Sequence, residues 1–157
     1  MKENSTSLKF RIIVFVLTFS VIAFAFIHSS MPSEVSGDES ESVMNVLQSI
    51  LNFFGFKGEL TDHLVRKLAH FTEYTAMGML FVSCAYSFDR IRPYKYYSQI
   101  LLSGLATAVC DETIQLNVPG RAGMVTDVLL DFAGVITGAL FMLLVFVIYR
   151  RTRKIMY

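Results

Sequence analysis

Ionisable side chains lie inside apolar stretches of this chain. Charged groups in such surroundings have an unfavourable free energy, so they usually mark a functional site. His70 and Glu73 are three residues apart and share one face of a helix, with Tyr74 beside them. Further along, Asp111 and Gln115 are four residues apart, which also places two side chains on one helix face. Imidazole and carboxyl groups are common metal ligands and common general acids and bases. These stretches therefore carry the candidate chemistry of the protein.

A second polar set lies around the start of the last apolar stretch. Asp127 and Asp131 are four residues apart, and Glu112 directly follows Asp111. Arg121 is the nearest permanent cation, and its guanidinium would offset part of the repulsion among the acids while offering a fork to a phosphate or carboxylate. With five carboxylates against one Arg and one His, the site needs protonated carboxyls, a bound cation or a ligand that completes the charge. The alternative is a purely structural network that holds the helices in register.

Three overlapping sets of candidate residues follow from these patterns. The residues predicted to contact a substrate are His70, Glu73, Tyr74, Asp111, Glu112, Gln115, Arg121 and Asp127. The candidate ligands of a divalent metal are His70, Glu73, Asp111, Glu112 and Asp127, although no compact metal-binding spacing supports them. The candidate acid and base residues are His70, Glu73 and Asp111. A divalent metal is the one cofactor that the sequence leaves open.

The elements that must position these residues are membrane-spanning helices. The chain of 157 residues is 54% hydrophobic and only 17% charged, so a bilayer suits it better than water. A span needs about 20 apolar residues. Four stretches meet this need, at about residues 10–28, 68–88, 97–116 and 126–149. The sequence thus predicts an all-α polytopic membrane protein, a single domain built as a four-helix transmembrane bundle.

The distribution of Lys and Arg predicts the orientation of the bundle, because these residues are retained in short cytoplasmic loops. With both termini inside, ten of the basic residues are cytoplasmic and four are external. The cytoplasmic segments are then the loop at 89–96 and the basic tail at 150–157. The external loops are 29–66 and 117–125, so the polar residues of three spans face the cell exterior. Within the first external loop, apolar residues at helical spacing from Val43 to Phe54 predict an amphipathic interfacial helix.

Several other readings of the sequence are disfavoured. The first span is predicted to be a signal anchor, since no small-residue cleavage site follows it. Cys84 and Cys110 both lie in spans, where cysteine is ordinary packing material. A net charge of +1 with no basic face argues against nucleic acid as a partner. Gly134 and Gly138 have the spacing that permits close helix approach.

Two stretches resemble the VanZ-like family, named for a teicoplanin-resistance protein. They are KLAHFTEYTAMGML, from Lys67 to Leu80, and DETIQLNVPGRAGMVTDVLLDFAGVITG, from Asp111 to Gly138. The polar positions shared with the family fall on His70, Phe71, Glu73, Tyr74, Asp111, Glu112, Gln115, Pro119, Gly120, Arg121 and Asp127. The sequence departs from the family at Arg66, near which an acid is common, and at Asp131, near which an asparagine is common. Direct roles are therefore not predicted for those two residues.

The resemblance implies a bacterial cytoplasmic-membrane protein of the cell envelope, linked in its named member to teicoplanin-type glycopeptide resistance. The first hypothesis is an outward-facing pocket that binds a lipid-linked cell-wall precursor or the glycopeptide itself. The second is a membrane-embedded, metal-dependent or metal-free, hydrolase or transferase acting on such a lipid. The third is an accessory subunit that acts through partners. Membrane lipid is an expected partner, a homodimer is left open, and a transporter is disfavoured because no repeated half is detectable.

Overall fold

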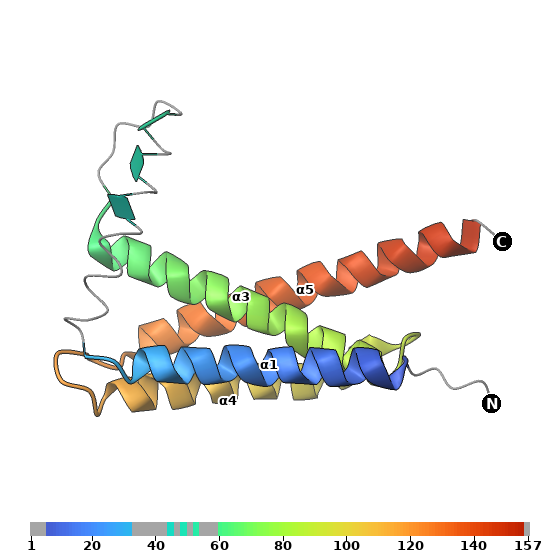
Figure 1. Ribbon diagram of the computed structural model, residues 1–157, viewed down its shortest axis with the longest axis horizontal. Helices are drawn as coiled ribbons and strands as arrows, with labels where there is room; N and C mark the ends of the chain where they lie inside the picture. The colour runs from blue at the N-terminus through green and yellow to red at the C-terminus, as the bar shows by residue number, and fades with distance from the viewer. Residues whose placement is uncertain (1–5, 33–43, 46–47, 50–51, 54–59, 156–157) are drawn as a thin grey trace.

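All the long secondary-structure elements in the described part of the chain are α-helices. The computed structural model describes residues 6–32, 44–45, 48–49, 52–53 and 60–155, and no strand occurs among them. The elements are α1 (Leu8–Ser29), α3 (Asp62–Phe88), the 3-10 helix η1 (Pro93–Tyr96), α4 (Tyr97–Gln115) and α5 (Val125–Ile155) (Figure 1). The predicted all-α class is confirmed. Half of the residues of the predicted interfacial helix, 43–54, lie outside the described residues.

Helix α3 begins earlier than the apolar pattern indicates. The sequence predicts a span from residue 68, preceded by an external loop up to residue 66, whereas the helix starts at Asp62. The hydroxyl of Thr61 caps it by accepting a hydrogen bond from the backbone N–H of Leu64 at 3.3 Å. Hydropathy marks the residue at which a helix becomes apolar, and in α3 that residue lies after the first residue of the helix. The first turns of α3 consequently carry basic residues on the same helix as His70.

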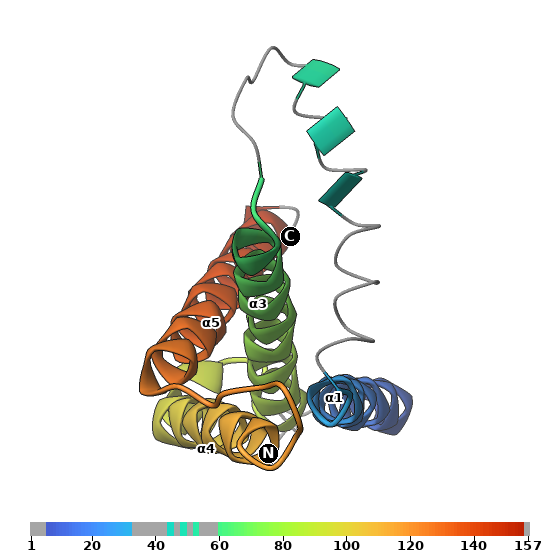
Figure 2. The same cartoon turned by 90° about the vertical axis from the view of Figure 1, so that its left-hand side faces the viewer.

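The long helices alternate in direction along the chain. Both described termini lie at one end of the molecule, whereas the start of α3 and the loop between α4 and α5 lie at the other end (Figure 1). Helices α3 and α5 form the most extensive pair, and α1 packs against α3 and α4 (Figure 2). Gly120, with φ 77°, allows the tight reversal between α4 and α5, as the sequence predicts. The fold thus brings together the end of α1, the start of α3 and this loop with the two helix ends that it joins.

Glycines permit the close crossing of α3 and α5. A Cβ atom at Gly138 would overlap the Thr75 carbonyl, and one at Gly134 would lie 2.7 Å from the Phe71 carbonyl oxygen. On the opposite helix, a Cβ atom at Gly78 would overlap the Val135 carbonyl. Backbones in this arrangement approach closely enough for dispersion contacts that side chains would prevent. The predicted packing role of Gly134 and Gly138 is confirmed.

The outer surface of the bundle is apolar. On α1, Ile13, Phe19 and Phe24 are 58%, 67% and 63% exposed, an arrangement that suits lipid rather than water. Helix α1 and residues Val125–Thr152 of α5 are long and apolar enough to cross a membrane. Among the described helices, α3 and α4 do not meet the same test of length and composition. The protein is thus described as a helical membrane protein, and the four-span bundle stays a prediction.

Candidate functional site

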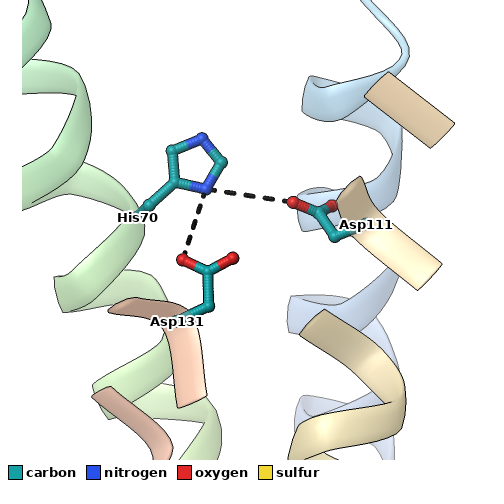
Figure 3. A group of neighbouring side chains, drawn as sticks. All are labelled: His70, Asp111 and Asp131. Carbon is teal, nitrogen blue, oxygen red and sulfur yellow. Dashed lines mark ion pairs between the residues drawn. The ribbon is translucent and has the colours of Figure 1, made fainter. Parts of the chain in front are cut away.

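Three helices bring His70, Asp111 and Asp131 together. The Nδ1 atom of His70 on α3 lies 3.9 Å from Asp111 Oδ2 on α4 and 3.8 Å from Asp131 Oδ1 on α5 (Figure 3). One nitrogen or oxygen from each of the three residues lies within 4.8 Å of the others. We call these residues the triad. It stands near the end of the bundle where the loop between α4 and α5 lies.

The two carboxylates of the triad are buried, and part of their hydrogen-bonding capacity is unused. Asp111 and Asp131 are each 0% exposed. Within the described residues, both carboxylate oxygens of Asp131 accept no hydrogen bond. The hydroxyl of Ser29, which is 1% exposed at the end of α1, lies beside Asp111 and is positioned to donate to it. Buried polar atoms that lack partners are costly, so their presence in one place calls for a ligand or a proton.

Glu112 and Gln115 connect the end of α4 to the following loop. Gln115 Nε2 donates to Asp111 Oδ2 at 3.3 Å and to Glu112 Oε1 at 3.2 Å. The second oxygen of Glu112 accepts a hydrogen bond from the Met124 backbone N–H at 2.9 Å. Met124 immediately precedes α5, where helical N–H groups have no partner within the helix. Two predicted site residues thus fix the loop and orient one acid of the triad.

Arg121 connects the same loop to α1. Its Nη2 atom donates to the carbonyl oxygen of His28 at 3.2 Å, near the end of α1 where carbonyls lack partners within the helix. Burial lowers the pKa of Arg121, and the neighbouring positive charge of Arg66 lowers it further. The Nε atom is buried and makes no hydrogen bond within the described residues. Part of the guanidinium therefore remains available for an anion.

A pocket of about 150 Å³ opens beside the triad and includes two of its members. The lining residues are His63, Arg66, Lys67, His70, Glu112, Gln115, Gly120, Arg121, Ala122, Met124, Asp127, Leu130 and Asp131. The basic residues of the lining are partly or fully exposed, whereas Glu112 and Asp131 are buried. Lys67 Nζ forms an ion pair of 3.0 Å with Asp127 Oδ1. The pocket therefore has a mostly basic mouth and an acidic floor.

The structure places the remaining predicted site residues outside this pocket. Glu73 is half-buried one turn along α3 from His70, and its Oε1 atom makes no hydrogen bond within the described residues. Tyr74 is 0% exposed and packs in the core with Met77 and Val135. Its hydroxyl lies 3.5 Å from the Thr107 carbonyl oxygen as a donor. Six of the eight residues predicted to contact a substrate line the pocket or belong to the triad.

Asp131 is the residue that sequence reasoning undervalued. Its four-residue spacing from Asp127 was the available signal, because that spacing places both acids on one face of α5. The two acids nevertheless have different surroundings: Asp127 is 25% exposed and paired with Lys67, whereas Asp131 is buried. Depth along the helix separates the two carboxylates, and spacing alone does not contain that information.

The fold and the polar cluster together define a helical membrane protein with an ionisable site buried near one end of its bundle. A family model described as VanZ/LLP1 matches residues 14–148, so the chain belongs to the VanZ/LLP1 family. The resemblance drawn from the two sequence stretches is confirmed at the level of the family. Comparisons with curated proteins and with solved structures found no match.

Proposed function

We propose that the pocket binds the phosphate-bearing head group of a lipid-linked cell-wall precursor at the outer face of the cytoplasmic membrane. The observation that carries this proposal is the basic mouth of the pocket, which Arg66, Lys67 and Arg121 line. Guanidinium and ammonium groups are the usual partners of phosphate oxygens. The apolar outer surface of the bundle would keep the lipid tail beside the helices while its head group enters.

The size of the pocket favours a small anionic group over a whole glycopeptide antibiotic. The pocket has a volume of about 150 Å³. One or two phosphate groups suit that space, whereas a glycopeptide would have to remain outside it. In this proposal, the resistance linked to the family arises from altered handling of the precursor. The external position of the pocket follows from the distribution of Lys and Arg, as predicted above.

A binding assay with a matched pair of lipids tests this function. The purified full chain is reconstituted in nanodiscs and titrated with a polyprenyl pyrophosphate or with the uncharged polyprenol of equal length. We expect the pyrophosphate to bind more tightly, and Arg121→Ala to weaken that preference by about tenfold or more, since a charge-assisted hydrogen bond contributes about 1.5–3 kcal/mol. Equal binding of the two lipids would contradict the proposal.

Two variants control for indirect effects. Arg150→Ala removes a cation at the opposite end of the molecule, where Arg150 contacts the Ile91 carbonyl, and should bind as the wild type does. Arg66→Ala provides a second change at the pocket mouth, in case Arg121→Ala releases α1. In cells, Arg121→Ala and Asp111→Asn proteins that reach the membrane and retain full protection against teicoplanin would exclude a role of the site in resistance.

A second candidate function is catalysis on such a lipid, as a membrane-embedded hydrolase or transferase. The proximity of His70 to two carboxylates favours it, because a carboxylate that orients an imidazole is a recurrent acid and base arrangement. The test is incubation of the protein with lipid-linked precursors, followed by mass spectrometry of the products. Conversion by the wild type that His70→Gln abolishes would support catalysis, and unchanged lipids would count against it.

A further inference from the structure

We propose that the triad of His70, Asp111 and Asp131 binds a divalent transition-metal cation. Asp131 was not among the metal ligands predicted from the sequence, and it replaces Glu73, Glu112 and Asp127 in the set that the geometry favours. The inference goes beyond head-group binding, because an ion held by protein side chains needs no lipid to be present.

The distances within the triad suit a bound ion. Zinc lies about 2.0–2.2 Å from nitrogen and oxygen ligands, so two donors of one ion lie at most about 4.4 Å apart. The separations of 3.9 and 3.8 Å from His70 Nδ1 to the two carboxylates meet this limit. The three ligand atoms, one from each residue, lie within 4.8 Å of one another, so the third separation needs at most a shift of about half an ångström. These distances are too long for direct hydrogen bonds.

Carboxylate oxygens that accept no hydrogen bond give an independent reason to expect an ion. Both oxygens of Asp131 accept no hydrogen bond within the described residues, although the side chain is fully buried. The cation that faces this region from the loop, Arg121, donates to a carbonyl of α1 and forms no ion pair within the described residues. Lys67 is paired with Asp127. A divalent cation would supply the missing positive charge where the carboxylates converge.

The chemistry of the donors indicates which cation would fit. One imidazole nitrogen with two carboxylate oxygens suits zinc or manganese better than magnesium or calcium, which prefer ligand sets made wholly of oxygen. Three protein ligands leave further coordination positions for water or for an oxygen of a bound molecule. His70 and Asp131 also line the pocket, so these positions would face it. Gln115 would orient Asp111 as an outer partner of the site.

The test uses the full chain in nanodiscs, stripped with a chelator and titrated with Mn²⁺ or Zn²⁺. Free Mn²⁺ is followed by electron paramagnetic resonance, and bound zinc by elemental analysis after dialysis. We expect one ion per chain, and at least a tenfold loss of affinity in Asp131→Asn, because even outer partners of metal ligands contribute 10- to 100-fold. Asp89→Asn, which removes a carboxylate at the opposite end of the molecule, is the control and should bind as the wild type does.

A spectroscopic measurement keeps the test decisive if Asp131→Asn fails to fold. Pulsed electron paramagnetic resonance of the Mn²⁺-loaded wild type should detect one histidine nitrogen coupled to the metal. The absence of a bound ion, the absence of that coupling, or an equal loss of affinity in Asp89→Asn would overturn the proposal.

The outcome is separable from that of the proposed function. Polyprenyl pyrophosphate binding is measured in the same nanodiscs with and without a chelator. Lipid binding by a protein that takes up no ion would refute the metal site alone. Stoichiometric metal binding without any preference for the charged lipid would refute head-group recognition alone.

Discussion

Glu112 joins two segments of the chain through its two carboxylate oxygens. One oxygen accepts from Gln115 on the same helix, and the other accepts from the Met124 backbone N–H that precedes α5. Glu112 is only 5% exposed, so water cannot easily replace either hydrogen bond if it is lost. At the scale of single residues, Glu112 therefore has a structural role in addition to any contact with a ligand.

Replacing Glu112 tests this duty. Glu112→Ala should lower the free energy of unfolding by about 1–3 kcal/mol, because the Met124 N–H loses its buried acceptor. Glu112→Gln should be much less destabilising, since an amide oxygen can still accept the bond. Thermal unfolding in detergent, followed by circular dichroism, measures both. Equal losses for the two variants would show that charge, rather than the hydrogen bond, matters at this position.

Asp89 provides a pH-dependent contact at the opposite end of the molecule. Its Oδ1 atom accepts from the backbone N–H groups of Ile91 and Arg92, each at 3.0 Å, and its Oδ2 atom lies 2.8 Å from Lys95 Nζ. The hydrogen bond from Lys95 is the main reason why the pKa of Asp89 is lowered from 3.8 to about 2. A carboxylate with a lowered pKa stabilises the folded loop fully above its unfolded pKa, and the contribution disappears as pH falls through the folded pKa.

Amide hydrogen exchange around Ile91 and Arg92 should therefore speed up relative to the rest of the chain between pH 3.8 and about 2. In Asp89→Asn, the two amides should exchange faster already at neutral pH and show no added acid dependence in that interval. Lys95→Ala should shift the wild-type change to higher pH. An acid dependence that persists unaltered in Asp89→Asn would assign it to another group.

At the scale of helices, the crossing of α3 and α5 depends on residues without side chains. Gly138 lies against the carbonyl of Thr75, and Gly78 lies against that of Val135. Since the triad takes His70 from α3 and Asp131 from α5, this crossing sets how far apart the two residues stand. The glycines therefore influence the separation of His70 and Asp131 without contacting either residue.

Gly138→Val should lower the free energy of unfolding by about 3 kcal/mol or more, at the upper end of the cost of overpacking, because the clash involves backbone that cannot rotate away. Ala133→Val adds comparable bulk at an exposed position of the same helix and should have little effect. Thermal unfolding in one detergent compares the two variants. A stable Gly138→Val protein would show that the helices can separate at low cost.

Sequence patterns predicted the helices well because long apolar stretches leave few other structures in a bilayer. They also drew attention to most of the side chains that the structure brings together in the pocket and the triad, because charge inside such stretches is rare. The contact from Arg121 to His28 was not foreseeable, since a backbone carbonyl accepts it and residue type gives no sign of that role. The division between Asp127 and Asp131 was hidden for a different reason, since it depends on which neighbours α3 and α4 provide at each depth.

At the scale of the whole molecule, the helices alternate so that both described termini lie at the end opposite the start of α3 and the loop between α4 and α5 (Figure 1). The bias of Lys and Arg toward that end predicts that it faces the cytoplasm. In this orientation, the pocket opens to the exterior, where the head groups of envelope lipids can reach it. An inverted molecule would present the same pocket to the cytoplasm.

Labelling with a membrane-impermeant maleimide tests the orientation in intact cells. In a background with Cys84 and Cys110 replaced by Ala, Asn117→Cys in the loop after α4 should react without permeabilisation. Arg151→Cys, near the end of α5, should react only after the membrane is opened. The reverse pattern would place the triad on the cytoplasmic side and remove the basis for an external ligand.

The distribution of the triad over α3, α4 and α5 also has a consequence for biosynthesis. Because translation proceeds from the N-terminus, a nascent chain that ends at Met124 contains His70 and Asp111 but lacks Asp131. The loop arginine that closes onto α1 is likewise made late, more than ninety residues after its acceptor His28, as the separation of 93 shows. Assembly of the polar centre must therefore wait for insertion of the final helix, and a chain truncated before α5 would leave His70 and Asp111 without their third partner.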